Sequence, residues 1–386
     1  LKSPAPTLTG IVYATNGTTP VRDARVRVFD NVKNRELGEF EAVTSSAGLW
    51  SMNLPAGTYS IYAAPPRGNS NSGDSEQIST VTVSSDITTN TTWTKNNVYK
   101  LSGLIYIDSL VTLTIEPGTI IRGDSTVGNS SLIVRRGAKL YALGTASEPI
   151  VFTSEKSTAT RAPGNWGGII ILGKATYNGS GAFGGAGTAN VEGITASIKT
   201  TYGGGTSPDD NDNSGTLKYV RIEYAGVPFV TNNEINSLTL GGVGSGTTLE
   251  YIQVYRAGDD AFEWFGGTVN AKYLLAIGTW DDDFDTDFGY AGKVQFALAQ
   301  RVKEIADVSG SNGFESDNDA TGSANSPKTS AIFSNVTIIG PLSASLSASG
   351  NNANYQHAAQ IRRNSAMSLF NSILGNYTEG IYIDDS

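Results

Sequence analysis

The chain has 386 residues, enough for two or three domains, and only 16% of them are charged. Its net charge of −9 arises from 27 basic and 36 acidic residues, and the sequence contains no basic patch of the kind that binds nucleic acid. The chain has no cysteine, which excludes disulfides, and no apolar run approaches the ~20 residues of a membrane span. With 39% hydrophobic residues it can bury an extensive core, so disorder is excluded.

Residues 1–85 are predicted to form a small β-sandwich. GIVYA, ARVRVFD, GLWSMNL and GTYSIYAAP are short alternating segments separated by turns, and about seven strands fit in this length. Alternation places Val26 and Val28 on one face of the sheet. The phrases PVRDARVRV and TSSAGLWSMNLPAGTYS resemble the carboxypeptidase-regulatory-like (transthyretin-like) sandwich. That resemblance implies an Ig/transthyretin-like accessory module without catalysis.

Residues 86–97 are predicted to be a linker. The preceding segment RGNSNSGDSEQ is polar, and the phrase DITTNTTWTKNN contains few apolar residues. A long hairpin loop within one domain is the alternative.

Residues 98–386 are predicted to be a right-handed parallel β-helix, which makes the whole chain all-β. Strand-sized apolar phrases such as LSGLIYI, SLIVRRGAKLYALG, WGGIIILG and TTLEYIQVYRAG recur at roughly 20 to 30 residues, the signature of a solenoid. The irregular coil lengths exclude a left-handed hexapeptide helix. A β-propeller is the alternative, although no four-stranded blade repeats.

The predicted solenoid resembles a group of β-helix proteins that Bacteroidota export. The resemblance rests on NWGGIIILG, DDNDNSGTLKYVRIEYAG, DDAFEWFGGTVNAKY, DDDFDTDFGY and SGSNGFESDND, and covers nearly all of residues 86 to 341. It implies an extracellular or outer cell-surface protein, exported and processed. Many members carry a C-terminal sorting domain for type IX secretion. This sequence stops at IYIDDS without one, so we expect that it was cleaved or that a longer protein continues.

An acidic tract is the sharpest candidate site. It places five carboxylates within seven residues, and a bound divalent cation would relieve their repulsion. Oxygen ligands favour Ca²⁺ over Zn²⁺. The predicted ligands are Asp281, Asp283, Asp285 and Asp287. The alternative is an extended strand whose aspartates face water while Phe284 and Phe288 face inward.

Two loops read D-x-D-x-[ST]-G, a pattern in which alternate side-chain oxygens converge on Ca²⁺. Their candidate ligands are Asp210, Asp212 and Ser214 in one loop, and Asp317, Asp319 and Thr321 in the other. Neither is an EF-hand, because the twelfth position holds Arg221 or Lys328 instead of glutamate. The alternative is ordinary turn chemistry.

A further acidic group lies one coil before the tract. Asp259, Asp260 and Glu263 are expected to align with it as a stripe on one face, together with Glu223 and Glu234. A pair of carboxylates in such a stripe suits a glycosidase. A solvated or Ca²⁺-bridged ladder is the alternative.

Polysaccharide lyases suggest a second enzymatic interpretation, since they generally combine Ca²⁺ with a basic side chain. Lys293 and Arg301 follow the acidic tract and are the candidate bases. The chain lacks a recognisable lyase motif, and His357, its only histidine, gives little support to a Ser-His-Asp triad.

Two tryptophans beside acidic residues are candidates for stacking on sugars. Trp264 and Trp280 would bind glycans if exposed, and burial in the solenoid core is the alternative. Asp108-Ser109-Leu110 resembles the O-glycosylation signal of Bacteroidota, which makes Ser109 a candidate glycosylation site.

The end of the sequence still consists of strand phrases, SLFNSILGNYTEGIYIDD, without a capping segment. We therefore predict an extracellular structural or adhesive β-helix protein, stiffened by Ca²⁺ and able to assemble head to tail with itself. The alternatives are a Ca²⁺-dependent carbohydrate-active enzyme, either a lyase or a glycosidase, and a non-catalytic glycan-binding protein.

Overall fold

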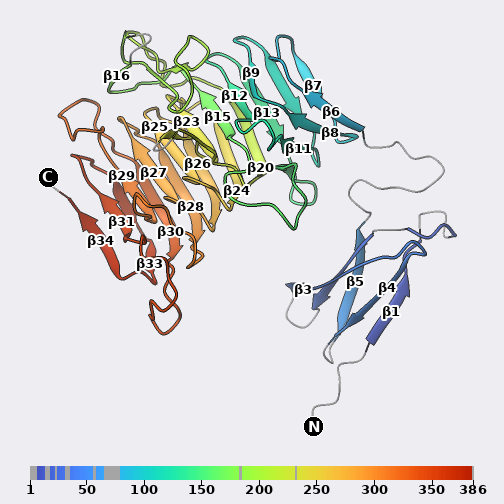
Figure 1. The fold of residues 1–386 in the computed structure, drawn as a ribbon. Helices are drawn as coiled ribbons and strands as arrows, with labels where there is room; N and C mark the ends of the chain where they lie inside the picture. Colours follow the sequence, from blue (N-terminus) through green and yellow to red (C-terminus); the bar gives the residue numbers. More distant parts are fainter. Residues whose placement is uncertain are drawn as a thin grey trace. The chain divides into compact units, whose positions relative to one another are not determined.

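The computed structural model describes residues 7–13, 18–21, 24–30, 35–54, 58–64, 79–181, 185–230 and 233–384 (Figure 1). Strands are the regular elements of these residues, which confirms the all-β prediction. None of the described residues belongs to a helix that is long and apolar enough to cross a bilayer. The chain divides into two compact units, Leu1–Ser79 and Thr80–Ser386.

The first unit contains two small antiparallel sheets. Its described strands are β1(Thr7–Ile11), β2(Arg25–Asp30), β3(Arg35–Val43), β4(Leu49–Asn53) and β5(Tyr59–Ala64). β1 pairs with β4, while β2 lies between β3 and β5. Val26 and Val28 are both fully buried, as their alternation predicts. The assignment to a transthyretin-like sandwich stays a prediction.

The segment predicted as a linker contributes strand to the second unit. β7(Thr91–Trp93) pairs in parallel with β10(Thr112–Ile115), and β8(Asn97–Leu101) begins within residues 86–97. Trp93 is only 3% exposed and stacks on Tyr99 with ring centroids 4.7 Å apart. This one buried aromatic residue anchors a segment whose composition is otherwise polar.

The second unit is a parallel β-helix built from two long sheets, which confirms the predicted solenoid. From β24 to β31 the chain alternates strictly between the two sheets, and neighbouring coils pair in parallel. The 14-stranded sheet contains β6(Ser79–Val83), β7, β8, β10, β11(Ile120–Gly123), β13(Lys139–Leu143), β14(Ile150–Ser154), β20(Gly215–Glu223), β24(Thr248–Tyr255), β26(Asn270–Ile277), β28(Lys293–Gln300), β30(Ile332–Ile339), β32(Ser368–Phe370) and β33(Ile373–Gly375).

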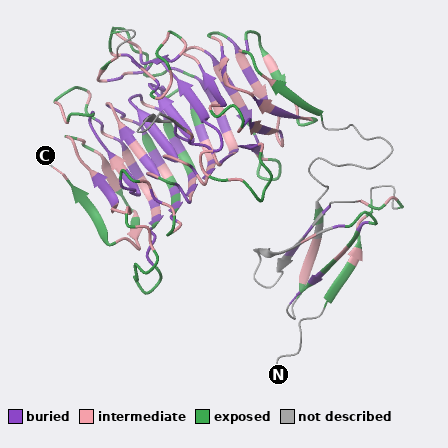
Figure 2. Ribbon diagram, viewed as in Figure 1, coloured by how far each residue is buried: buried purple, intermediate pink, exposed green. Residues whose placement is uncertain are grey.

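The nine-stranded sheet carries the candidate site on its outer face. It contains β9(Leu104–Ile107), β12(Ser131–Val134), β15(Gly168–Leu172), β23(Leu238–Gly241), β25(Phe262–Phe265), β27(Phe284–Asp287), β29(Phe314–Ser316), β31(His357–Ile361) and β34(Glu379–Ile383). Inward side chains of both sheets form one continuous apolar core, so most of the central strands are buried (Figure 2).

Aromatic residues mark a bend in the middle of the long strands of the 14-stranded sheet. Tyr219, Tyr251, Tyr273 and Phe296 have φ values of 50°, 55°, 59° and 61°, in the left-handed region that side chains with a Cβ seldom adopt. Their rings stack with successive centroid separations of 4.4, 4.4 and 5.2 Å. Stacking between coils thus offsets the backbone strain of each bend.

An insert between β15 and β20 covers part of the outer face of the nine-stranded sheet. Its short strands are β16(Ser180–Gly181), β17(Gly185–Ala186), β18(Ala189–Asn190) and β19(Thr201–Tyr202). Tyr177 and Tyr202 of the insert form a second core with outward residues of the sheet such as Ile170 and Phe265. A further hairpin joins β21(Pro228–Val230) to β22(Asn233–Glu234).

The last described strand is exposed along its whole length. All five residues of β34 are accessible, and Ile381 and Ile383 are 59% and 72% exposed (Figure 2).

Candidate functional site

Three successive strands of the nine-stranded sheet share one pattern. Phe262, Phe284 and Phe314 face the core, and their rings lie 5.7 and 5.4 Å apart. Since side chains alternate along a strand, the residue after each phenylalanine faces outward. Those residues pair in register and form an acidic row of Glu263, Asp285 and Glu315.

The residues two positions before these phenylalanines form a hydrogen-bonded ladder. Asp260 Oδ1 accepts the backbone N–H of Asp282 at 2.7 Å, and the Asp282 carboxylate accepts the backbone N–H of Asn312. Asn312 Oδ1 in turn accepts the backbone N–H of His357 at 3.0 Å. Side chains at one edge of the sheet thus satisfy backbone donors of the next coil, a structural role that leaves the other carboxylate oxygens available.

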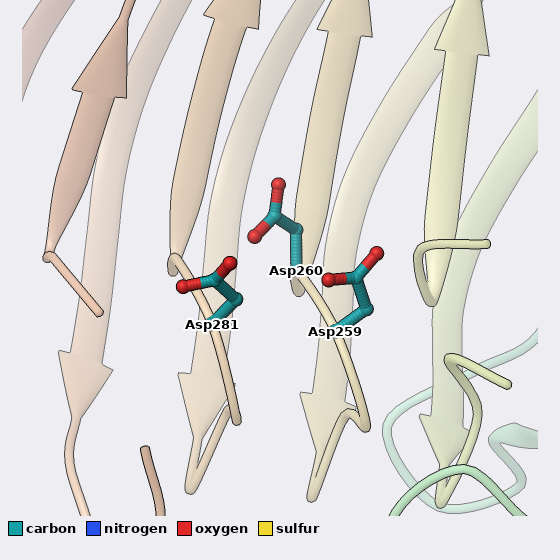
Figure 3. A group of neighbouring side chains, drawn as sticks. All are labelled: Asp259, Asp260 and Asp281. Carbon is teal, nitrogen blue, oxygen red and sulfur yellow. The ribbon is translucent and has the colours of Figure 1, made fainter. Parts of the chain in front are cut away.

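Two groups of carboxylates converge around Asp260. Asp260, Glu263 and Asp285 each offer an oxygen within 4.8 Å of the others, and so do Asp259, Asp260 and Asp281. Figure 3 shows Asp259 and Asp260 on one coil and Asp281 on the neighbouring coil. Coordinating oxygens around Ca²⁺ lie about 2.3–2.6 Å from the ion, so three oxygens this close together can share one ion.

The electrostatics of this group favour a cation. Burial raises the pKa of Asp260, Glu263 and Asp285 well above the ordinary range, and the neighbouring carboxylates raise it further. Glu315, at the end of the row, is ion-paired with Arg362, and its pKa is raised to about 7 by burial. Charged carboxylates packed this closely repel one another unless protons or a cation neutralise them.

Unpaired oxygens at the site fit the donor set of a hard cation. Within the described residues, Asp285 Oδ1, Asp281 Oδ1 and Thr239 Oγ1 are buried without a hydrogen-bond partner. Thr239 is only 2% exposed and pairs in register with Glu263. Buried polar atoms without partners are rare, and a metal ion with its water ligands would satisfy them. Carboxylate and hydroxyl oxygens suit Ca²⁺ rather than Zn²⁺.

The surroundings of the site are partly open to solvent. Glu192 of the insert lies close enough to raise the pKa of Glu263. Trp280 is 39% exposed, and its indole N–H donates to the carbonyl of Ala306 at 2.9 Å, which fixes the ring beside Asp281. Ser309 Oγ donates to Asp281 Oδ2 at 2.7 Å. Glu192 therefore lies near the acidic row, and the partly exposed Trp280 lies next to Asp281 of the second converging group.

The family model of the pectate-lyase-like β-helix domain matches residues 85–386, which is most of the chain. The chain belongs to this pectate-lyase-like β-helix family. A search of curated proteins finds no match. Domains of this family suit a surface protein or a carbohydrate-active enzyme, and they are typically extracellular.

Within this pectate-lyase-like β-helix, the acidic tract of the sequence divides between two environments. Asp281 and Asp285 belong to the converging groups, whereas Asp283 faces inward. Asp283 Oδ2 lies 2.9 Å from Arg301 Nε, and neither side chain is exposed. Burial raises the pKa of Asp283 to about 6, although Arg301 lowers it. The ligand role predicted for Asp283 and the catalytic role predicted for Arg301 do not fit this geometry.

Asp287 lies at the far end of β27 from Asp281. Its Oδ1 accepts the backbone N–H of Phe288 at 2.6 Å, and its pKa is raised by burial and then by the charge of Asp317. It belongs to neither of the two converging groups.

The loop with Asp210, Asp212 and Ser214 uses its side chains to fix turns. Asp210 Oδ1 accepts the backbone N–H of Thr176 at 2.8 Å, while Ser214 Oγ donates to Asp212 Oδ2 at 3.2 Å. Asp210 is exposed and Asp212 is buried, and each carboxylate already accepts a hydrogen bond within the protein. Turn chemistry, the alternative considered from the sequence, accounts for this loop.

The second loop satisfies its carboxylates in the same manner. Asp319 Oδ1 accepts the backbone N–H and the hydroxyl of Thr321, both at 2.9 Å, and Ser323 donates to both of its carboxylate oxygens. Although burial works against it, these hydrogen bonds lower the pKa of Asp319 to about 2. Asp317 is paired with Arg362 and Arg363. Neither carboxylate needs a metal ion.

The remaining candidates are dispersed over the β-helix. Trp264 is fully buried and stacks 5.4 Å from Tyr290, so it belongs to the core. Lys293 is exposed at the start of β28, in the other sheet. Glu223 pairs with Arg221 in β20, also in the other sheet, and the side chain of Glu234 lies outside the described part.

His357 stacks on Tyr382 and pairs with Glu379. Ser109 is exposed, and its hydroxyl donates to the carbonyl of Arg136 at 2.8 Å.

Four coils share a signal that the sequence analysis missed. NSLT (236–239), DAFE (260–263), DDFD (282–285) and NGFE (312–315) each place a polar residue first, a core residue third and an outward polar residue fourth. Alignment of these four phrases identifies Thr239 and Glu315 as residues of the site. It also separates Asp282, which belongs to the hydrogen-bonded ladder, from Asp283, which faces inward.

Proposed function

We propose that this protein is an extracellular β-helix protein that binds Ca²⁺ through Asp260, Glu263 and Asp285 and holds acidic glycans beside the ion without cleaving them. The observation that carries this proposal is the convergence of three carboxylate oxygens within 4.8 Å of one another, from the buried Asp260 and Glu263 and the partly buried Asp285. A bound Ca²⁺ keeps coordination positions for carboxylate or hydroxyl groups of a ligand.

A partly exposed aromatic ring supports the choice of a glycan. Trp280 lies next to Asp281 in the sequence, and 39% of its surface is accessible. Its ring offers an apolar face for a sugar while its N–H is already bonded within the protein. A negatively charged sugar would reach the site through the cation, since the protein surface there is acidic.

The arginines near the acidic row are already paired in the described part of the chain, which supports binding without cleavage. Arg301 is fully buried with Asp283, and Arg362 is engaged by Glu315 and Asp317. Among the described residues, these arginines lie near the acidic row without a free guanidinium for proton abstraction. A lyase needs such a base within hydrogen-bond reach of its substrate.

Retention on immobilised polygalacturonate and on neutral glycans tests this proposal. We expect stronger retention on the acidic glycan in Ca²⁺ than in EDTA, and loss of this Ca²⁺-dependent difference in the variant Asp285→Asn. Glu304→Gln is the matched control, because Glu304 is 62% exposed and pairs only loosely with Lys303 at 3.7 Å. Equal retention of the wild type in Ca²⁺ and in EDTA, or an undiminished Ca²⁺-dependent retention of Asp285→Asn, would contradict the proposal.

A carbohydrate-active enzyme is the second candidate. Glu263 and Asp285 lie on adjacent strands, and both have raised pKa values, a property of catalytic acids. Incubation of the protein with the same glycans distinguishes the two functions. Unsaturated or reducing-end products that Asp285→Asn no longer forms would establish the enzyme.

We also propose that the protein assembles with itself, as expected for the structural or adhesive role predicted from the sequence. β34 presents a row of exposed backbone and the apolar residues Ile381 and Ile383, to which a strand of a second copy of this chain can pair. Light scattering over a hundredfold range of protein concentration tests it. We expect association that Ile381→Lys weakens, and a constant monomeric mass would refute the proposal.

A further inference from the structure

Three successive coils bring basic side chains together at one edge of the nine-stranded sheet. β9, β12 and β15 are neighbours in this sheet (Figure 1), and their carboxyl ends meet at the same edge because the strands are parallel. Ser109 follows β9, Arg135 and Arg136 follow β12, and Lys174 follows β15. The register of the solenoid therefore gathers three cationic groups that are far apart in the sequence.

These residues surround a hollow of about 230 Å³. Its lining consists of Ser109, Leu110, Arg135, Arg136, Gly137, Lys174 and Ile198. Gly137 has a φ of +81°, and a Cβ at this position would lie 3.2 Å from Lys174 Nζ. Glycine therefore lets the ammonium group approach the turn closely. The described residues that line the hollow include no acidic side chain, although the chain carries a net charge of −9.

The positive charges of the hollow are only partly compensated. Arg135 is paired with Asp108, but its Nε is buried without a hydrogen-bond partner among the described residues. Arg136 Nη1 donates to a neutral acceptor, the carbonyl oxygen of Gly203, at 2.8 Å. Burial lowers the pKa of Arg136, and the adjacent charge of Arg135 lowers it further. Lys174 is exposed, and it lies near the carboxylate of Asp212, whose pKa is raised by burial and lowered in part by the charge of Lys174.

We propose that this hollow binds an oxyanion, a carboxylate or sulfate group carried by an acidic glycan. Guanidinium and ammonium groups bind such oxyanions through charge-assisted hydrogen bonds. The rim of the hollow carries Leu110 and Ile198, which are 87% and 58% exposed. Their aliphatic surfaces can pack against the C–H groups of a sugar ring, which a free inorganic anion lacks.

The hollow is separate from the acidic row. In the nine-stranded sheet, β15 and β23 lie between β12 and β25. Asp259 and Asp260 precede β25 at the amino edge of the sheet, whereas Arg135 and Arg136 follow β12 at the carboxyl edge. This second site does not depend on Ca²⁺, so it can be measured in EDTA, where the proposed cation site makes no contribution.

Calorimetric titration in EDTA tests the proposal with polygalacturonate, chondroitin sulfate, neutral dextran, monomeric galacturonate and sodium sulfate as probes. We expect the wild type to bind one or both of the acidic polymers, and Lys174→Glu to bind them at least ~10-fold more weakly, since it reverses a charge that contacts the anion. Lys272→Glu introduces the same charge change at an exposed position of β26 and is expected to leave the affinity unchanged.

Thermal melts accompany the titrations, and an unchanged melting temperature of Lys174→Glu shows that the variant is folded. If this variant is nevertheless destabilised, Lys174→Gln provides the same test without charge reversal. The proposal is overturned if the wild type binds no acidic polymer or if neutral dextran binds equally well. It is also overturned if Lys174→Glu and the control Lys272→Glu show the same affinity. Sulfate or monomeric galacturonate that binds as tightly as the polymers would overturn the assignment to a glycan.

Discussion

Replacement of Arg301 by methionine is expected to destabilise the β-helix by about 3–5 kcal/mol at neutral pH, because it leaves a buried carboxylate without its counter-charge. The Asp283 and Arg301 side chains are both inaccessible, and Oδ2 lies 2.9 Å from Nε. Arg301 also donates to the carbonyl of Thr279 and to the hydroxyl of Tyr377, both at 3.2 Å. The variant loses these hydrogen bonds together with the ion pair.

The size of this effect depends on pH in a defined direction. The pKa of Asp283 is raised to about 6 by burial even with Arg301 beside it, and removal of Arg301 raises it further. A carboxyl group whose pKa is raised on folding stabilises the folded state at low pH. This contribution is complete below the unfolded pKa of about 4 and is lost as the pH rises through the folded pKa. Arg301→Met therefore costs less stability near pH 5 than near pH 8.

Urea unfolding monitored by tryptophan fluorescence measures both effects. The double variant Asp283→Leu/Arg301→Met replaces the pair by apolar groups and is expected to recover most of the lost stability. Lys303→Met is the matched control, because Lys303 is half exposed and should contribute little. Unchanged urea midpoints of Arg301→Met at both pH values would refute the buried ion pair, and with it the argument that Arg301 cannot act as a base.

Other variants test the bends, the loops and the two tryptophans. Asparagine tolerates the left-handed bend, but Tyr273→Asn loses the stacking contacts with the two neighbouring rings. We therefore expect the free energy of unfolding to fall by ~1–3 kcal/mol in chemical unfolding. Asp319→Asn should lose ~1–3 kcal/mol at neutral pH. The wild-type contribution of Asp319 should be lost as the pH falls from about 4 through its folded pKa of about 2, which acid titration of both proteins measures. Trp264→Ala should cost ~3–5 kcal/mol, whereas Trp280→Ala should lower the melting temperature less than Trp264→Ala and weaken glycan retention.

The fold could be predicted from the sequence because its signals are local and repeated. Short apolar phrases separated by turn residues predict strands, and their recurrence predicts a solenoid. The segment at 86–97 was harder to predict, since its Thr- and Asn-rich composition resembles a linker. Burial of Trp93 against Tyr99 decides its structure, and that contact depends on how the first coils close.

The candidate site could be predicted only in part. The acidic tract was recognised, but the sequence alone gives neither the partner of each carboxylate nor the face on which it lies. Asp283 pairs with Arg301 across a coil, and Asp285 meets Glu263 and Asp260 through the register of neighbouring strands. The D-x-D-x-[ST]-G loops show the converse, because the same residues that ligate Ca²⁺ also cap tight turns.

Titration of the protein with Ca²⁺ by isothermal calorimetry tests most directly whether Asp260, Glu263 and Asp285 form a cation site. We predict saturable binding to the wild type, at least ~10-fold weaker binding to Asp285→Asn because one charged ligand is lost, and unchanged binding to Glu304→Gln. No Ca²⁺ binding to the wild type, or equal affinity of Asp285→Asn, would contradict this account.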